Sequence, residues 1–159
     1  MSLQSTFEWL EALAFSVSIR QSTWMSAMVN VVHLVTVTVL AGALLIVDLR
    51  LLGTGLTRQP VAQLARDARP WFMGAFLGMI VTGIPQLTST AMKQYYSPWF
   101  WYKMELLVLA VIFTFTVRRW VVNADEGRVG PLRAKLVGLV SIVLWSGVAI
   151  NGRLIGLLQ

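Results

Sequence analysis

The sequence predicts an all-α integral membrane protein, a bundle of four transmembrane helices preceded by an interfacial helix. Apolar residues make up 57% of the chain and charged residues 13%, whereas soluble domains have about 45–50% and about 25%. The chain contains four apolar runs, each long enough for the roughly 20 residues that cross a bilayer. Six of the seven Trp residues lie at or beyond the ends of these runs, where amphipathic rings prefer the headgroup level.

The four predicted spans cover residues 25–47, 71–91, 99–117 and 136–158. With their connections they use almost the whole chain, so we predict a single transmembrane domain over residues 1–159. Ser5 and Glu8 have the spacing of a capping box, and apolar residues recur on one helical face after them. We therefore expect an interfacial helix over residues 6–19.

The basic residues predict the orientation in the membrane. Nine of the 13 basic residues lie in the connections after the first and third spans: Arg50, Arg58, Arg66, Arg69, Arg118, Arg119, Arg128, Arg133 and Lys135. The positive-inside rule makes both connections cytoplasmic, so both termini are expected outside a bacterial inner (cytoplasmic) membrane. Within the first connection, residues 60–69 are predicted to form a second interfacial helix that starts with Pro60. Asp48 and Arg50 are expected to brace this connection.

The net charge of +6 does not indicate a nucleic-acid partner, because the basic residues lie beside the ends of apolar runs. The bilayer is the partner that the sequence predicts. The second span also carries Gly74, Gly78 and Thr82 at four-residue spacing, which favours close helix packing. This face is expected either to pack inside the bundle or to dock a larger membrane complex or a second copy of the chain.

Four ionisable residues fall inside the predicted spans: His33, Lys103, Glu105 and Arg153. Such residues are costly in hydrocarbon and indicate functional sites. At 1.5 Å per residue, His33 lies about 12 Å, Lys103 about 6 Å and Arg153 about 8 Å inside the outer ends of their spans. Asn30 lies one turn outward of His33. Polar groups from three helices are thus predicted at similar depth.

A b-type haem would combine these groups naturally, because an imidazole ligates iron and cations near the surface pair with propionates. In this interpretation His33 is the metal ligand, Lys103 and Arg153 meet the propionates, and Asn30 adds a polar contact. The chain has one His, so Met104, Met28, Met92, water or an open position completes the coordination. The alternative is structural: His33 donates to a carbonyl or to Thr36, the two cations reach the headgroups, and Glu105 pairs with one of them.

A resemblance bears on this choice. His33 in the segment VVHLVTVTVLAGALLIVDLRLLG, Tyr102-Lys103-Met104 and Asn151-Gly152-Arg153 resemble an uncharacterised bacterial four-helix membrane family. That family is similar to the CopD-like copper-resistance proteins and, more remotely, to the HemJ-type protoporphyrinogen oxidases. The HemJ likeness implies haem binding through residues that match His33 and Lys103. The CopD likeness implies copper handling, which needs soft ligands such as Met25, Met28, Met92 and Met104.

The leading hypothesis from the sequence is a haem b-binding or electron-transfer membrane protein with its site in the outer half of the bundle. Its rivals are a cofactor-free accessory subunit of a larger membrane complex and a copper-handling membrane protein. Whether the protein is an enzyme stays open, because the sequence shows no nucleophile–base pair, phosphate loop or paired catalytic carboxylates.

Overall fold

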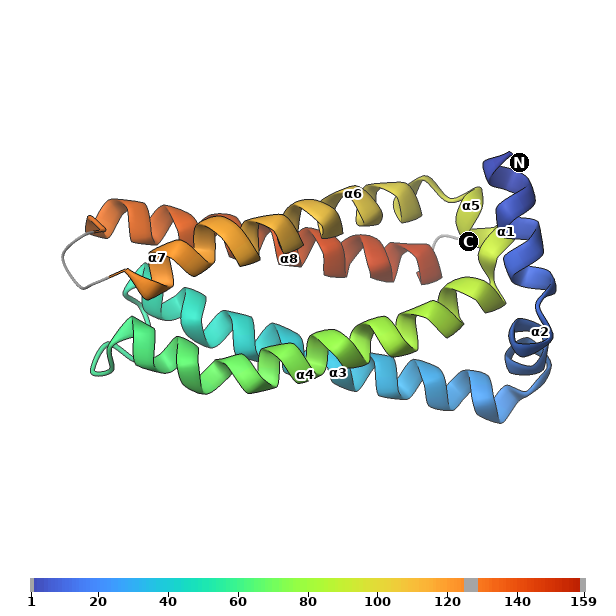
Figure 1. Cartoon of the computed structure of the whole chain (residues 1–159), viewed down its shortest axis with the longest axis horizontal. Coiled ribbons are helices and arrows are strands. Elements are labelled where there is room, and N and C mark those ends of the chain that lie inside the picture. Colours follow the sequence, from blue (N-terminus) through green and yellow to red (C-terminus); the bar gives the residue numbers. More distant parts are fainter. Residues whose placement is uncertain (1, 125–128, 158–159) are drawn as a thin grey trace.

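A computed structural model describes residues 2–124 and 129–157. It confirms the predicted all-α fold: four long helical segments are apolar enough to cross a membrane, and the described residues form no strand. Figure 1 shows these segments side by side. Their bounds are Thr23–Leu52 (α3), Val61–Ser89 (α4), Pro98–Asn123 (α6, η1 and α7) and Pro131–Leu157 (α8). Arg128 and Leu158, which the sequence analysis assigned to a connection and a span, lie outside the described residues.

The two ends of the bundle differ. We call the end at which α3 begins and α8 finishes the terminal end, and the opposite end, where α3 is joined to α4, the loop end. Two short helices, α1 (Leu3–Ala12) and α2 (Ala14–Gln21), lie across the terminal end (Figure 1). A helix across the end of a bundle suits the headgroup level.

The N-terminal segment is helical, as predicted, but its helix bounds and its capping residue differ from the prediction. The single helix expected over residues 6–19 is two helices, because Leu13 adopts an extended conformation between them. The cap is Ser2 rather than Ser5: the Ser2 hydroxyl accepts a hydrogen bond from the Ser5 amide at 3.2 Å. Ser is a favourable residue at either position, so the capping motif alone did not select the start.

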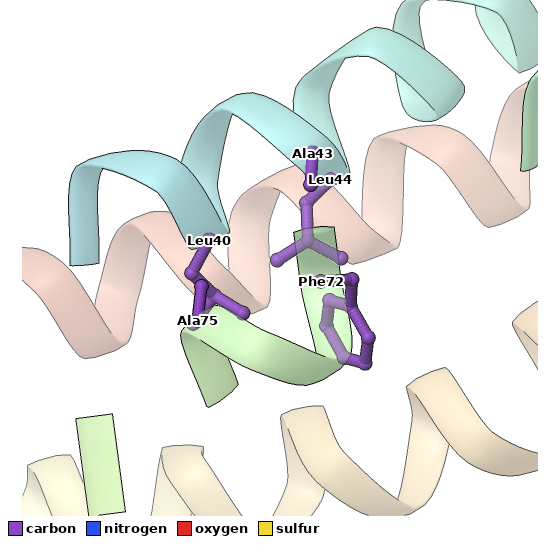
Figure 2. Packing of buried hydrophobic residues seen from close by; sticks show 5 residues of the cluster. All are labelled: Leu40, Ala43, Leu44, Phe72 and Ala75. Carbon is purple, nitrogen blue, oxygen red and sulfur yellow. The ribbon is translucent and has the colours of Figure 1, made fainter. Parts of the chain in front are cut away.

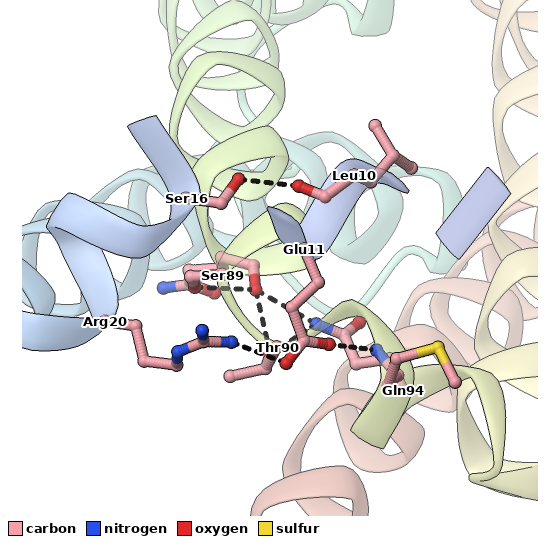
Figure 3. A network of polar contacts seen from close by, with 9 residues as sticks. Leu10, Glu11, Ser16, Arg20, Ser89, Thr90 and Gln94 are labelled. Carbon is pink, nitrogen blue, oxygen red and sulfur yellow. Dashed lines mark hydrogen bonds and ion pairs between the residues drawn. The ribbon is translucent and has the colours of Figure 1, made fainter. Parts of the chain in front are cut away.

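A polar network holds the corner between α1 and α2 against the rest of the chain (Figure 3). The Glu11 carboxylate accepts from Arg20 at 2.5 Å and from the Met92 amide at 2.7 Å, where the short helix α5 (Ala91–Tyr95) begins. The buried Ser16 hydroxyl donates to the Leu10 carbonyl at 2.8 Å. The bonds of Arg20 and Ser16 fix α2 against α1, and the bond from Met92 joins Glu11 of α1 to the connection between α4 and α6.

The second predicted interfacial helix is not separate. Residues 60–69 run directly into the second span as α4, with Pro70 and Pro85 inside the helix. A proline removes one backbone hydrogen bond, but its φ is compatible with a helix. Leu64 and Phe72, on either side of Pro70, are both buried against the other helices, and this packing holds the two parts in line.

The third span is longer than predicted and changes its helical type. After α6 (Pro98–Phe113), five residues form a π-helix, η1 (Thr114–Arg118), and α7 (Arg119–Asn123) follows. Short π-helical turns inside an α-helix widen it locally and occur often at functional positions. Here the turn ends at Arg118, a residue that the sequence analysis had assigned only to membrane orientation.

The packed core lies toward the loop end. Leu40, Ala43 and Leu44 of α3 meet Phe72 and Ala75 of α4 (Figure 2), and Trp145 of α8 packs against this cluster. A second cluster nearer the loop end is built from Val47, Leu51, Leu64, Val121 and Val122. Helix α3 lies along α4 and also along α8, and α6 lies along α8.

Candidate functional site

One section of the bundle, in its terminal half, contains no buried residue. Segments 23–39 of α3, 76–87 of α4, 101–109 of α6 and 149–157 of α8 are all intermediate or exposed. Buried residues lie on both sides of this section, from Leu40 and Ala75 toward the loop end and from Thr88 and Phe100 toward the terminal end. Along α6 the section is about 12 Å long. We call it the open section.

Polar side chains from all four spans lie within the open section. His33 and Thr36 come from α3, Thr82 and Gln86 from α4, Lys103 from α6 and Asn151 from α8; all six are partly buried. Polar groups at membrane depth are tolerated where they face the bundle interior or a cavity. The arrangement brings the predicted His33 and Lys103 into one section.

His33 is oriented by a hydroxyl on the neighbouring helix. Its Nδ1 lies 2.8 Å from Thr82 Oγ1, and Thr82 in turn donates its hydroxyl proton to the Gly78 carbonyl at 2.7 Å. Because that proton is already used, Thr82 accepts from His33, which places the imidazole proton on Nδ1. The other nitrogen, Nε2, then carries a lone pair, and it has no hydrogen-bond partner within residues 2–124 and 129–157.

Small residues make room for this contact. A Cβ atom on Gly83 would lie 3.5 Å from His33 Cε1, and one on Gly78 would lie only 2.7 Å from Thr36 Cγ2. The expected alternative, a hydrogen bond between His33 and Thr36 side chains, is not formed; Thr36 donates instead to the His33 carbonyl at 2.8 Å. The Gly78-x-x-x-Thr82 spacing therefore defines the α4 face that receives α3.

Lys103 enters the open section from the side of α6 that faces α8. Its Nζ lies 3.8 Å, and its Cε 3.6 Å, from the position of a Cβ on Gly152. The ammonium group is close enough to act electrostatically on His33. Among the residues that the structure describes, Lys103 forms neither a hydrogen bond nor an ion pair, so a partly buried cation faces this section without an anion.

The other predicted site residues lie at its margins. Asn30 is exposed, and its Oδ1 accepts from Gln86 Nε2 at 3.4 Å. Arg153 is exposed and continues the outward stripe of α8 that includes Val143 and Ile150. Glu105 is exposed on α6, and the described residues include no ion pair between it and either cation.

The four methionines named as possible ligands differ in exposure. Met25 and Met28 are exposed on α3, while Met92 and Met104 are partly buried on α5 and α6. Within the described residues no three His, Cys, Asp or Glu side chains come together as a metal-binding group. A metal held at His33 by the described residues would therefore take one imidazole, with thioethers or solvent as further ligands.

A second polar cluster, toward the loop end, was missed by the sequence analysis. Asp48 of α3 is 1% exposed; its Oδ1 accepts from Arg118 Nε at 2.7 Å and its Oδ2 accepts from the Ser141 hydroxyl at 2.6 Å. The expected contact between Asp48 and Arg50 is absent, because Arg50 Nε donates to the Gln59 carbonyl at 2.7 Å. Arg50 braces the connection as predicted, whereas Asp48 joins α3 to η1 and α8.

Comparison with known proteins places the chain in a family. A family model described as a family of unknown function, DUF6644, matches residues 6–158. The chain belongs to this family. The match covers all four spans of this DUF6644 protein together with most of α1. No curated protein and no solved structure matches the chain. The resemblance to CopD-like and HemJ-type proteins stays a prediction.

Proposed function

We propose that this DUF6644 protein binds a b-type haem in the open section, that His33 Nε2 would hold the iron, and that the role of the protein is electron transfer. The observation that carries the proposal is the imidazole itself: Thr82 holds the Nδ1 proton, and the lone pair of Nε2 is unused in the described part of the chain. Metal-ligating histidines are characteristically fixed through the other ring nitrogen in this way.

The residues present fit the rest of the group. A haem carries carboxylates, and Lys103 supplies a partly buried cation that has no anion among the described residues. Asn30, one turn from His33, adds a polar contact near the terminal end. We leave Arg153 out of the site, because it continues the outward stripe of α8. A haem b would supply one-electron chemistry. The protein supplies one imidazole, one cation and a section of the bundle in which every residue is at least partly exposed.

We further propose that the loop end faces the cytoplasm of a bacterial inner membrane and that the open section lies in the outer half of the bilayer. The support is the set of exposed basic residues at the loop end, which includes Arg58, Arg66, Arg133 and Lys135. In this orientation Lys103 lies toward the outer headgroups, where its ammonium group would meet the carboxylates of a haem.

The spectrum of the purified protein tests the haem proposal. Protein expressed with an ample haem supply should show a Soret band, and His33→Ala should abolish it, since no second histidine is present in the chain. Lys103→Gln should weaken haem retention by about 1.5–3 kcal/mol, the usual contribution of a charge-assisted hydrogen bond. Arg153→Gln, which removes the same charge outside the site, should leave retention unchanged.

Folded, colourless protein under these conditions would reject the haem proposal. The copper content of the same sample would then test the copper-handling alternative. The accessory-subunit alternative has one structural feature in its favour: Gly74 is exposed, and a Cβ there would meet no atom within 4 Å. If neither haem nor copper is bound, His33 is a residue that joins α3 to α4 through Thr82.

A further inference from the structure

The outward face of α4 changes character along its length. It starts with two exposed arginines, Arg66 and Arg69, and continues through Met73, Leu77 and Ile84, which are 43%, 63% and 54% exposed. The positions follow helical spacing, so they form one continuous stripe. A cationic start above an apolar stripe has the polarity of a phospholipid, with the headgroup toward the loop end and the acyl chains along α4.

Further positive charge adjoins the start of this stripe. Arg58 precedes α4, and Arg119 lies on α7, which packs against α4. In the described ranges the ion pairs are Arg20 with Glu11 and Arg118 with Asp48, so none of these four arginines forms an ion pair there. One carboxylate, the exposed Asp67, lies between Arg66 and Arg69 in the sequence, and the group keeps a net positive charge. A guanidinium group presents several donors in a fixed geometry that matches the oxygens of a phosphate.

A glycine interrupts the apolar side chains of the stripe. Gly74 is exposed beside Met73 and Leu77, and a Cβ added to it would meet no atom within 4 Å. The missing side chain leaves open space on the helix surface at this position rather than a contact with another helix. Trp71, 67% exposed, lies three residues before Gly74, toward the loop end. An exposed Trp at this position indicates the headgroup level.

We propose that the face formed by Arg66, Arg69, Gly74 and Leu77 is a binding site for an anionic phospholipid. Arg66 and Arg69 bind the headgroup phosphate, Arg58 and Arg119 raise the local positive potential, and an acyl chain lies over Gly74 beside Leu77. The apolar stripe distinguishes this ligand from free phosphate, which would need the arginines alone. The site is independent of His33 and of any haem.

Native mass spectrometry of the detergent-solubilised protein tests the site. Phosphatidylglycerol should be retained at least tenfold better than phosphatidylcholine with the same acyl chains. The double variant Arg66→Gln/Arg69→Gln should lose this preference. The matched control Arg133→Gln/Lys135→Gln removes the same charge at the same end of the bundle, from exposed positions on α8, and should keep it.

Two further measurements separate the lipid from other sources of phosphate. Gly74→Leu should weaken retention of phosphatidylglycerol several-fold while leaving the circular dichroism and melting of the protein unchanged. Inorganic phosphate in excess should not displace the lipid. Equal retention of the two lipids, equal losses in the two double variants, or displacement by inorganic phosphate would each overturn the proposal.

Discussion

The proton on the His33 ring is held by a hydroxyl. In most metal sites the second nitrogen of a ligating histidine donates to a carboxylate or to a backbone carbonyl. Here the Thr82 hydroxyl accepts a hydrogen bond from His33 Nδ1 and donates one to the Gly78 carbonyl. The Gly78 carbonyl therefore orients the imidazole through one intermediate hydroxyl group. The arrangement adds no charge in the membrane, and it leaves Nε2 as the reactive nitrogen.

Substitution of Thr82 tests whether this relay sets the tautomer. Thr82→Val keeps the shape and removes the acceptor, so the Nδ1 proton loses its partner and the imidazole is free to turn. We expect 10- to 100-fold weaker haem retention, the usual effect of losing a group that orients a ligand. Thr82→Ser keeps the hydroxyl and should retain haem nearly as well as the parent protein.

The tautomer can also be measured without haem. The ¹⁵N shifts of the single histidine should show a protonated Nδ1 in the parent protein and in Thr82→Ser, and a mixture of tautomers in Thr82→Val. Identical ring shifts in all three proteins would show that Thr82 does not determine the tautomer.

At the level of single residues, the sequence predicted which groups lie inside the membrane and could not predict their partners. His33 and Lys103 stand out because charged and imidazole groups are rare in apolar runs. Thr82 was noted only for its spacing from Gly78, since the register between α3 and α4 decides that it meets His33. Arg118 and Asp48 are separated by 70 residues, and no local pattern relates them.

Among the elements, α4 carries glycines with two different surroundings. Gly78 faces α3, where a Cβ would lie 2.7 Å from Thr36 Cγ2, whereas Gly74 meets nothing within 4 Å. The first is a site of close approach between helices, and the second is part of the outward face. Equal spacing in the sequence therefore gave one prediction for two positions that the structure distinguishes.

This difference predicts opposite outcomes for the same substitution. Gly78→Leu forces α3 and α4 apart and should lower stability by about 1–3 kcal/mol, the usual cost of overpacking; it should also disturb the contact between His33 and Thr82. Gly74→Leu should leave the melting temperature of the purified monomer unchanged. A stable Gly78→Leu protein would mean that the α3–α4 interface is not closely packed at this level.

The lengths of the elements were predicted less well than their number. Hydrophobicity located four spans, but at the loop end each helix continues beyond its apolar run, because backbone hydrogen bonding does not stop where the apolar side chains do. At the terminal end α4 finishes at Ser89, before the predicted end of the second span at residue 91. The break at Leu13 and the continuation of α4 through Pro70 both depend on packing, through Ser16 in the first case and through Leu64 and Phe72 in the second.

The whole molecule consists of a packed part toward the loop end, the open section, and a smaller packed layer at the terminal end that includes Ile19, Ala91 and Phe100. Toward the loop end, Asp48 ties α3 to Arg118 of η1 and to Ser141 of α8, and a Cβ on Gly138 would lie 2.9 Å from the Asp48 carbonyl oxygen. A buried ion pair needs its remaining polar atoms satisfied to be tolerated, which Ser141 provides. This joint holds the helices together at one end while they carry His33 and Lys103 in the open section.

The orientation of these parts across the membrane follows from charge and can be tested with cysteines, because the chain has none. Thr57 and Asn123 are exposed at the loop end, and Tyr96, 68% exposed, lies near the terminal end. Ser97 is unsuitable for labelling because it is 2% exposed. In intact cells a membrane-impermeant maleimide should label Tyr96→Cys and should label Thr57→Cys and Asn123→Cys only after the membrane is opened.

The reason for this expectation is that translocation of loops rich in Arg and Lys is disfavoured, and the connection that contains Thr57 also contains Arg58 and Arg66. Labelling of Thr57→Cys from outside, with Tyr96→Cys protected, would reverse the orientation. The open section would then lie in the cytoplasmic half of the bilayer, and electrons would have to reach His33 from that side. A second maleimide that crosses the membrane serves as the control, since it should label all three variants in intact cells.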